Sequence, residues 1–216
     1  MDIFYSIVNF FVKGGAFMYP ILLVATFGAA IAIERYVTLT RMRIANKNSW
    51  NRVEPLLMKG DFDKAREVMG KDDTAVSRLL GMGLALQGAV RRRDDVEKAM
   101  EESMMEVIPQ LQKRTHYLAT FANLATLLGL LGTVSGLIHA FAAVATVNPA
   151  EKANLLSASI SEAMNCTAFG LMTAVPILFI HAFLQTKTTE LIDSLEMASV
   201  KFLNAITERQ PATAQA

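Results

Sequence analysis

The sequence has little of the chemistry that most soluble enzymes and metalloproteins use. It contains one cysteine, Cys166, and three histidines scattered at positions 116, 139 and 181. A single cysteine excludes an internal disulfide framework, and no histidine or cysteine spacing is typical of a metal site. The net charge of +1 gives no support for nucleic-acid binding. We find no nucleophile, base and orienting group together, so we expect no catalysis of covalent chemistry and no metal or cofactor.

Charge is also nearly absent from three long stretches. The 20 residues from Gly14 to Ile33 contain no Asp, Glu, Lys or Arg, and about 20 apolar residues suffice to cross a bilayer as a helix. The 31 residues from Tyr117 to Val147 contain only His139 as a possible charge, and the third stretch is interrupted only by Glu162 and His181. We therefore predict transmembrane helices at residues 14–35, 117–147 and 155–186. A short periplasmic turn at 148–154 makes the last two antiparallel neighbours.

The basic residues predict the orientation of these spans. Of the 21 Lys and Arg residues, 16 lie between Glu34 and His116. The positive-inside rule places that stretch in the cytoplasm, with the N-terminus outside and the C-terminus inside. Residues 1–13 lack the basic region of a cleavable secretory signal. We expect them to form a periplasmic amphipathic segment on the membrane surface, with a frayed terminus as the alternative.

The region between the first and second spans has a helical pattern. Around the Gly60-Asp61 pair we predict a helix-turn-helix in which Asp61 caps the second helix. An apolar stripe from Val96 to Leu118 predicts a helix that runs from Asp94 into the second span, with Pro109 as the place for a kink. The fold class is thus an all-α membrane protein with three transmembrane helices. Its long helices extend into a cytoplasmic helical region at 36–116 and a C-terminal helix and tail at 187–216.

One acidic residue lies inside a predicted span. An ionised carboxylate there costs about 3 kcal/mol on insertion scales and normally faces a bundle interior or water, so Glu162 is the leading candidate for handling ions. A glutamate at the membrane interface is the alternative. Asn165, Cys166 and Phe169 share its face on a helical wheel, which makes Asn165 and Cys166 candidate pore-facing residues. Thr167 borders this sector or bonds its own helix carbonyl.

The second span carries small and polar residues at helical spacing. Gly132 and Gly136 form a GxxxG pair that allows close helix packing, and Gly129 extends it by one turn. Thr133 offers a hydroxyl without bulk. His139 lies seven residues beyond Gly132, where a structural hydrogen bond and a proton relay are both open.

Several of these segments resemble the MotA/TolQ/ExbB proton-channel family. The resemblance is carried by Gly14–Pro20, Glu34-Arg35, Leu127–Val134, Ser161-Glu162-Ala163, Thr167–Leu171 and Ala174-Val175-Pro176. Three spans with the N-terminus outside look like the ExbB and TolQ branch, whereas the MotA type has four spans. The chain is therefore identified as ExbB-like.

The resemblance implies a function, partners and roles for three residues. Glu162 matches the family's essential glutamate, and Thr133 and Thr167 match its pore threonines. A homopentamer would surround two copies of an ExbD-like single-span partner within the membrane lipids. It would use the proton motive force to energise a TonB-like protein for outer-membrane import. A TolQ-like or motility motor subunit is the rival within the class, and a passive membrane scaffold is the rival outside it.

Overall fold

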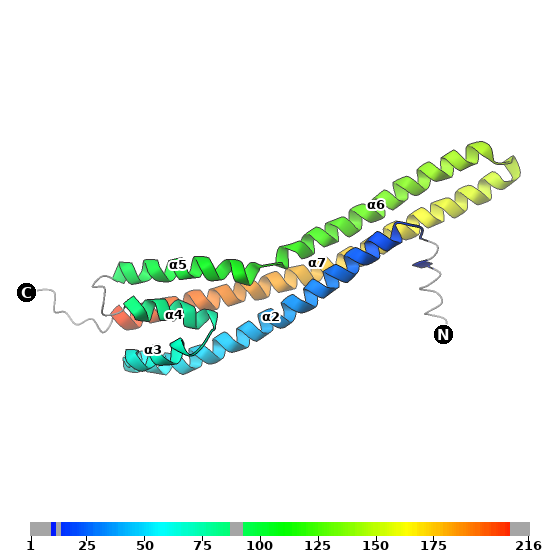
Figure 1. The fold of residues 1–216 in the computed structure, drawn as a ribbon. Helices are drawn as coiled ribbons and strands as arrows, with labels where there is room; N and C mark the ends of the chain where they lie inside the picture. Colours follow the sequence, from blue (N-terminus) through cyan, green and yellow to red (C-terminus); the bar gives the residue numbers. More distant parts are fainter. Residues whose placement is uncertain (1–9, 12–13, 87–92, 208–216) are drawn as a thin grey trace, which may run out of the picture. The chain divides into compact units, whose positions relative to one another are not determined.

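The structure is a computed structural model, and every regular element that it describes is an α-helix (Figure 1). It describes residues 10–11, 14–86 and 93–207. The elements are α2 (Met18–Lys59), α3 (Phe62–Gly70), α4 (Ala75–Leu86), α5 (Arg93–Gln112), α6 (Thr115–Thr146) and α7 (Pro149–Thr207). Three helical stretches, Met18–Lys59, Arg93–Thr146 and Pro149–Thr207, are long and apolar enough to cross a membrane. The predicted all-α membrane fold with three long apolar helices is confirmed.

The chain divides into two compact units. The first unit contains residues 1–34 and 114–183, and the second contains residues 35–113 and 184–216. The first unit holds nearly all of the charge-free sequence, and the second holds most of the basic residues. The two units are described separately below.

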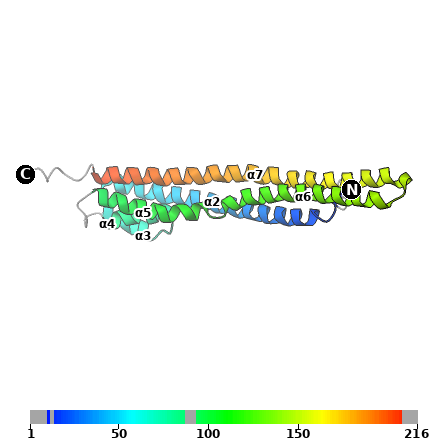
Figure 2. The same cartoon turned by 90° about the horizontal axis from the view of Figure 1, so that it is seen from above.

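In the first unit, α6 and the beginning of α7 form an antiparallel helix pair, which both views show side by side (Figure 1, Figure 2). Only Val147 and Asn148 separate the two helices. Most of the predicted turn at 148–154 is therefore helical. The local sequence explains this. Pro149 occupies the first helical position, which suits its fixed φ. The amide of Glu151 donates a hydrogen bond to the carbonyl of Asn148 at 3.0 Å, which begins the helix.

The start of α2 also belongs to the first unit. Met18 and Ile21 are fully buried, and the amide of Met18 donates to the carbonyl of Gly15 at 3.2 Å. Gly28 lies against the side chain of Ile177 on α7, where an added Cβ would be 2.8 Å from Ile177 Cδ1. Small residues on α2 thus allow it to pack closely on α7. The predicted N-terminal amphipathic segment lies outside the described residues except for Phe10 and Phe11.

The helix expected to run from Asp94 into the second span is interrupted, but not at Pro109. Pro109 lies inside α5, which continues to Gln112, and the interruption comes at Lys113 and Arg114. Arg114 has φ of 64°, a left-handed conformation that ends helical hydrogen bonding. Within the second unit, the buried Arg35 donates from its guanidinium to the Leu111 carbonyl. It thereby satisfies an acceptor that a helix C-terminus leaves unpaired.

The second unit is a helical bundle built around α4. Its fully buried side chains include Leu79, Leu80 and Leu84 of α4, Met100 of α5 and Phe202 of α7. Gly83 leaves room for the Phe202 ring, because an added Cβ would lie 2.5 Å from Phe202 Cε1. Burial of these apolar side chains against α5 and α7 explains why the short helix α4 is stable here.

The turn between α2 and α3 lies where predicted but is stabilised differently. Gly60 has φ of 78°, and the amides of Gly60 and Asp61 donate to the carbonyls of Leu57 and Leu56, both at 3.0 Å. This is the Schellman arrangement, for which glycine is the favoured residue. The Asp61 side chain makes no capping hydrogen bond and instead pairs with Lys64 at 2.5 Å. Asp61 thus occupies the N-cap position of α3, as predicted, but no side-chain hydrogen bond caps the helix.

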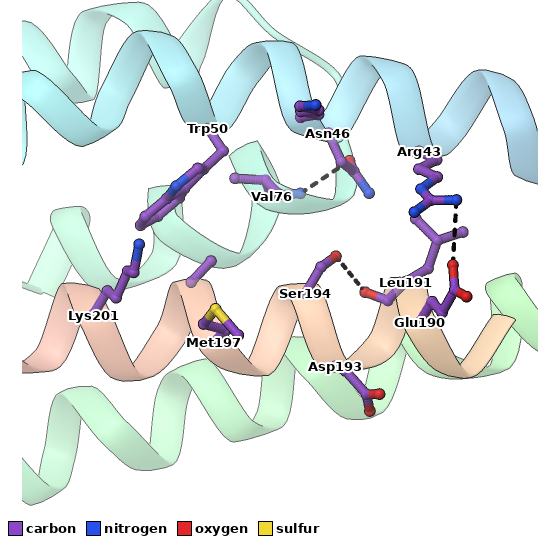
Figure 3. A pocket seen from close by; sticks show the side chains of 12 residues that line it. Arg43, Asn46, Trp50, Val76, Glu190, Leu191, Asp193, Ser194, Met197 and Lys201 are labelled. Atoms are coloured by element: carbon purple, nitrogen blue, oxygen red, sulfur yellow. Dashed lines mark hydrogen bonds and ion pairs between the residues drawn. The ribbon is translucent and has the colours of Figure 1, made fainter. Parts of the chain in front are cut away.

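A groove of about 400 Å³ opens between α2 and α7 in the second unit (Figure 3). The Lys201 ammonium lies 5.3 Å from the centre of the Trp50 ring at one end, and Arg43 pairs with Glu190 at 3.2 Å toward the other. Charges of both signs thus meet across the groove, and they connect α2 to α7. The exposed ion pair contributes little stability by itself, at most about 1 kcal/mol.

A polar cluster joins α2 to the turn before α4. The buried Ser49 hydroxyl donates to Asp72 at 2.6 Å, and Arg52 donates to the same carboxylate oxygen at 2.5 Å. The Ser49 hydrogen bond is the main cause that holds the pKa of Asp72 below its ordinary value; desolvation opposes it, and the hydrogen bond and charge of Arg52 add to the lowering. The folded state therefore prefers Asp72 ionised.

This preference predicts a pH dependence of stability. Because the pKa of Asp72 is lower folded than unfolded, its stabilisation is complete above about pH 4 and lost as pH falls through the folded value. We expect the midpoint temperature of unfolding of the detergent-solubilised chain to fall as the pH is lowered from 6 to 3. The fluorescence of its single tryptophan, Trp50, follows the unfolding. In Asp72→Asn this midpoint should fall less over that range. In the control Asp63→Asn it should fall as much as in the unmodified chain. Equal slopes for Asp72→Asn and the unmodified chain would contradict the assignment.

Candidate functional site

Two threonine hydroxyls meet between α6 and α7. Thr133 Oγ1 and Thr167 Oγ1 lie 3.1 Å apart. Thr167 can donate to the Gly129 carbonyl across the helix interface at 2.8 Å, and Thr133 can donate to the Leu130 carbonyl at 2.6 Å. Each hydroxyl has only one proton to donate, so a bond to a carbonyl and a bond to the other hydroxyl alternate. The pair is a hydrogen-bonding unit with more than one proton arrangement.

The glycines of α6 lie where α7 approaches most closely. An added Cβ would be 3.2 Å from Thr167 Cα at Gly129 and 2.9 Å from Ala163 Cβ at Gly136, and at Gly132 it would overlap the Cys166 sulfur. The contacts follow an antiparallel register, so residue numbers rise on α6 as they fall on α7. Close backbone approach is what allows the Thr167 hydroxyl to reach a carbonyl of α6.

Gly170 of α7 completes this contact and was not assigned a role from sequence. A Cβ at Gly170 would be 2.7 Å from the Ala125 carbonyl oxygen and 3.1 Å from Gly129 Cα. Two glycines therefore face each other at this point of the helix pair. The signal was available in the spacing of small residues on α7, since Ala163, Cys166 and Gly170 recur every three or four positions.

Glu162 lies on another part of α7 and is exposed within the chain. Its carboxyl group lies beside Gly15, in the turn before α2: a Cβ at residue 15 would overlap Oε1 and lie 3.1 Å from the carboxyl carbon. Phe169, on the same face of α7, contacts Phe10 and Phe11 with ring centres 6.4 Å and 5.8 Å apart. This face of α7 therefore meets the residues that precede α2.

The structure separates Glu162 from the threonine pair. In the part of the chain that is described, no hydrogen bond joins Glu162 to Thr133 or Thr167. The wheel angle of about 140° between positions 162 and 167 accounts for this, because Thr167 turns toward α6 while Glu162 turns toward the start of α2. The carboxylate and the threonine pair thus lie on different faces of α7, and Thr133 of the pair belongs to α6.

The other candidate residues differ in their surroundings. Cys166 is buried with its sulfur between α6 and α7 against Gly132, and Asn165 is half-buried. His139 is exposed, and its Nδ1 lies 2.8 Å from the Ser135 carbonyl, to which a protonated Nδ1 donates. Neither Asn165 nor His139 is joined to Glu162 by a hydrogen bond among the described residues.

One pair at helical spacing escaped the sequence analysis. Ser135 and His139 are four residues apart, and Ser135 Oγ lies 3.5 Å from His139 Nδ1. The shorter contact of that nitrogen goes to the Ser135 carbonyl, so the ring is not oriented to accept the serine proton. Within the described ranges, no group of histidine, cysteine or acidic residues could hold a metal ion.

Comparison with known proteins matches this chain to proton-channel proteins. The model of the MotA/TolQ/ExbB proton channel family matches residues 71–197, a range that includes Thr133, Glu162 and Thr167. A Methanothermobacter thermautotrophicus protein described as a homolog of biopolymer transport protein ExbB is 25% identical over 199 residues. The alignment covers 91% of this chain and 69% of that protein.

Two further relatives come from bacteria. A Synechocystis protein described as ExbB-like is 29% identical over 189 residues, covering 85% of this chain and 72% of that protein. The Tol-Pal system protein TolQ of Haemophilus influenzae is 31% identical over 110 residues, covering 51% of this chain and 46% of TolQ. The chain is therefore similar to these ExbB-type proteins over most of its length and to the TolQ protein of Haemophilus influenzae over about half.

The glycine contacts predict which substitution disrupts the helix pair. Gly132→Leu places a branched side chain where the Cys166 sulfur lies, so we expect it to separate α6 from α7 and to abolish the oligomer on native mass measurement. Overpacking of this kind costs about 1–3 kcal/mol or more. The matched control is Ala142→Leu, at an exposed position of α6, which should assemble normally. Normal assembly of Gly132→Leu would contradict a packing role for Gly132.

Proposed function

Because this chain belongs to the MotA/TolQ/ExbB proton channel family, we propose that it is the ExbB-like subunit of a motor that energises a TonB-like periplasmic protein for outer-membrane import. At the coarser level it is an ExbB/TolQ-type proton channel subunit located in the inner membrane. The observation that carries the proposal is the Glu162 carboxylate on the apolar helix α7, together with a hydroxyl pair formed by Thr167 of α7 and Thr133 of α6.

In this proposal Glu162 supplies the charge on the proton path. An ionised carboxylate within an apolar helix costs about 3 kcal/mol on insertion scales. Acidic residues at such positions therefore usually have a function, and binding a proton is one. Thr133 and Thr167 provide hydroxyls that exchange hydrogen bonds without breaking α6 or α7. The close approach of α6 and α7 that this exchange of hydrogen bonds needs is allowed by Gly129, Gly132 and Gly136, which have no side chains.

Exposed apolar side chains support assembly with other membrane components. Ile138, Phe141, Val175 and Phe179 lie in apolar helices and are between 63% and 77% exposed within the single chain. In a membrane, such surface is covered by lipid tails or by neighbouring helices. We propose a homopentamer around two copies of an ExbD-like single-span partner, with lipids on its outer side.

Relatives described as ExbB-like and relatives named TolQ both match this chain, so the TonB-linked role is our proposal and a TolQ-like role is its rival. The ExbB-type relatives align over 91% and 85% of this chain, and the TolQ proteins of Pseudomonas aeruginosa and Haemophilus influenzae align over 71% and 51%. Identities of 25% to 31% do not separate the two functions by themselves. Identification of the periplasmic protein that co-purifies with the complex separates them.

The orientation of the chain gives one test. In a Cys166→Ala background, cysteine at position 41 or 113 should react with an impermeant thiol reagent from the cytoplasmic side only. Cysteine at position 152 should react only from outside, since basic residues near span ends stay in the cytoplasm. Labelling of position 152 from the cytoplasm would overturn the predicted topology.

Glu162 gives the second and more direct test. Glu162→Gln keeps size and hydrogen bonding while removing the charge, so we expect an assembled complex with proton flux into vesicles reduced at least about tenfold. Losing one protonating group from a transfer path typically costs about 10²–10⁴-fold. Glu162→Asp should retain part of the flux because it retains the carboxylate.

The control for this test is Glu151→Gln, an exposed glutamate in the first turn of the same helix. It should conduct at the rate of the unmodified complex. If Glu162→Gln assembles and conducts normally, the carboxylate is structural and the scaffold alternative gains. Thr133→Val, which removes a hydroxyl at similar volume, provides an independent measure of the path.

A further inference from the structure

The turn before α2 is shaped around the end of the Glu162 side chain. Gly15 has φ of +74°, and a Cβ there would overlap Oε1 and lie 3.1 Å from Cδ and 3.4 Å from Cγ of Glu162. These three atoms are one carboxyl oxygen, the carboxyl carbon and the methylene carbon next to it. The space that a side chain at residue 15 would fill is thus occupied by the carboxyl group itself.

Two requirements therefore coincide at residue 15. The left-handed backbone conformation disfavours any residue with a Cβ, although asparagine adopts it more readily than most. The absence of a side chain matters separately, because a Cβ at residue 15 would displace the end of the Glu162 side chain from its present location. Since asparagine meets the first requirement and fails the second, the two can be tested apart.

The turn is held in place from both sides. The amides of Met18 and Tyr19 donate to the carbonyls of Gly15 and Ala16 at 3.2 Å and 3.4 Å, which fixes the backbone leading into α2. Phe11 packs against Tyr19 and Phe169 with ring centres 5.4 Å and 5.8 Å apart, which ties the same segment to α7. Gly15 therefore presents a fixed surface to a long and otherwise mobile side chain.

We propose that Gly15 is a positioning residue for the Glu162 carboxyl group. This inference rests on the proposed function of Glu162 in proton transfer. A glutamate has three rotatable side-chain bonds, and proton transfer requires the acceptor oxygen at hydrogen-bond distance, about 2.6–3.2 Å, from the donor. The bare Cα of Gly15 leaves room for Oε1 beside the N-terminal turn of α2, where the helix dipole favours a carboxylate, and a Cβ would move Oε1 away from it. Residue 15 thereby determines where the proton is received.

The test measures proton flux through the complex of the full chain with its single-span partner in vesicles. Gly15→Ala and Gly15→Asn should each reduce flux at least about tenfold, the usual loss when a group in a transfer path is misplaced. Ala16→Ser adds an atom to the same turn at an exposed position and should change flux less than twofold, a near-neutral surface effect. The pH profile of the residual flux should shift for both Gly15 variants and stay unchanged for Ala16→Ser.

Rescue by a shorter carboxylate is the deciding comparison. Glu162→Asp removes one methylene and withdraws the carboxyl group from residue 15, so Gly15→Ala with Glu162→Asp should conduct more than Gly15→Ala alone. If Gly15→Ala prevents assembly, recovery of assembly in the double variant supports the contact, and its absence overturns the proposal. Normal flux in Gly15→Ala, normal flux in Gly15→Asn, or no rescue in the double variant also overturns it.

These outcomes are distinct from failure of the proposed function. If Glu162→Gln conducts normally, the role of Glu162 itself is wrong, whatever the Gly15 variants do. If Glu162→Gln loses flux while Gly15→Asn keeps it, the carboxylate is needed but residue 15 does not position it. The rate at which a carbodiimide modifies Glu162 in the assembled complex gives a second readout, and it should change in Gly15→Ala but not in Ala16→Ser.

Discussion

The close contact of α6 with α7 at Gly129 and Gly170 is the constraint on which the functional part of the molecule depends. A hydrocarbon surrounding offers no hydrophobic drive to join two apolar helices, so packing and hydrogen bonding must do it. Glycine on both sides lets backbone atoms meet, and it brings the Thr167 hydroxyl within 2.8 Å of a carbonyl on α6. The threonine pair exists because the two helices touch there, and any residue that separates them removes the pair.

The fold was largely predictable because its strongest signals are long and repetitive. Charge-free stretches of 20 residues or more and helical periodicity persist over many turns, so small local errors do not change the outcome. The errors came from single residues. Pro109 is tolerated inside α5, while Arg114, an ordinary residue in sequence terms, takes the left-handed conformation that interrupts the helix. Asp61 similarly prefers Lys64 to the amides that it was expected to cap.

The candidate site was predictable only in part. Glu162, Thr133 and the α6 glycines stand out because polar and small residues are conspicuous within apolar sequence. A helical wheel also placed Glu162 and Phe169 on a common face, and both now lie beside the residues before α2. What the wheel lacks is the identity of the partner. No sequence pattern links Gly15 to a position nearly 150 residues away, and Gly170 acquires meaning only opposite Gly129.

The threonine pair also bears on reversibility. Each hydroxyl carries one proton and has a carbonyl acceptor close by, at 2.6 Å for Thr133 and 2.8 Å for Thr167, besides the other hydroxyl at 3.1 Å. An arrangement so nearly balanced has no built-in polarity, since turning both hydroxyls over yields a state of similar energy. On the proposed proton path, such a pair would pass protons equally well in both directions. In the proposed motor, the direction of net proton flow would then be set by the difference in proton potential across the membrane and not by the threonine pair.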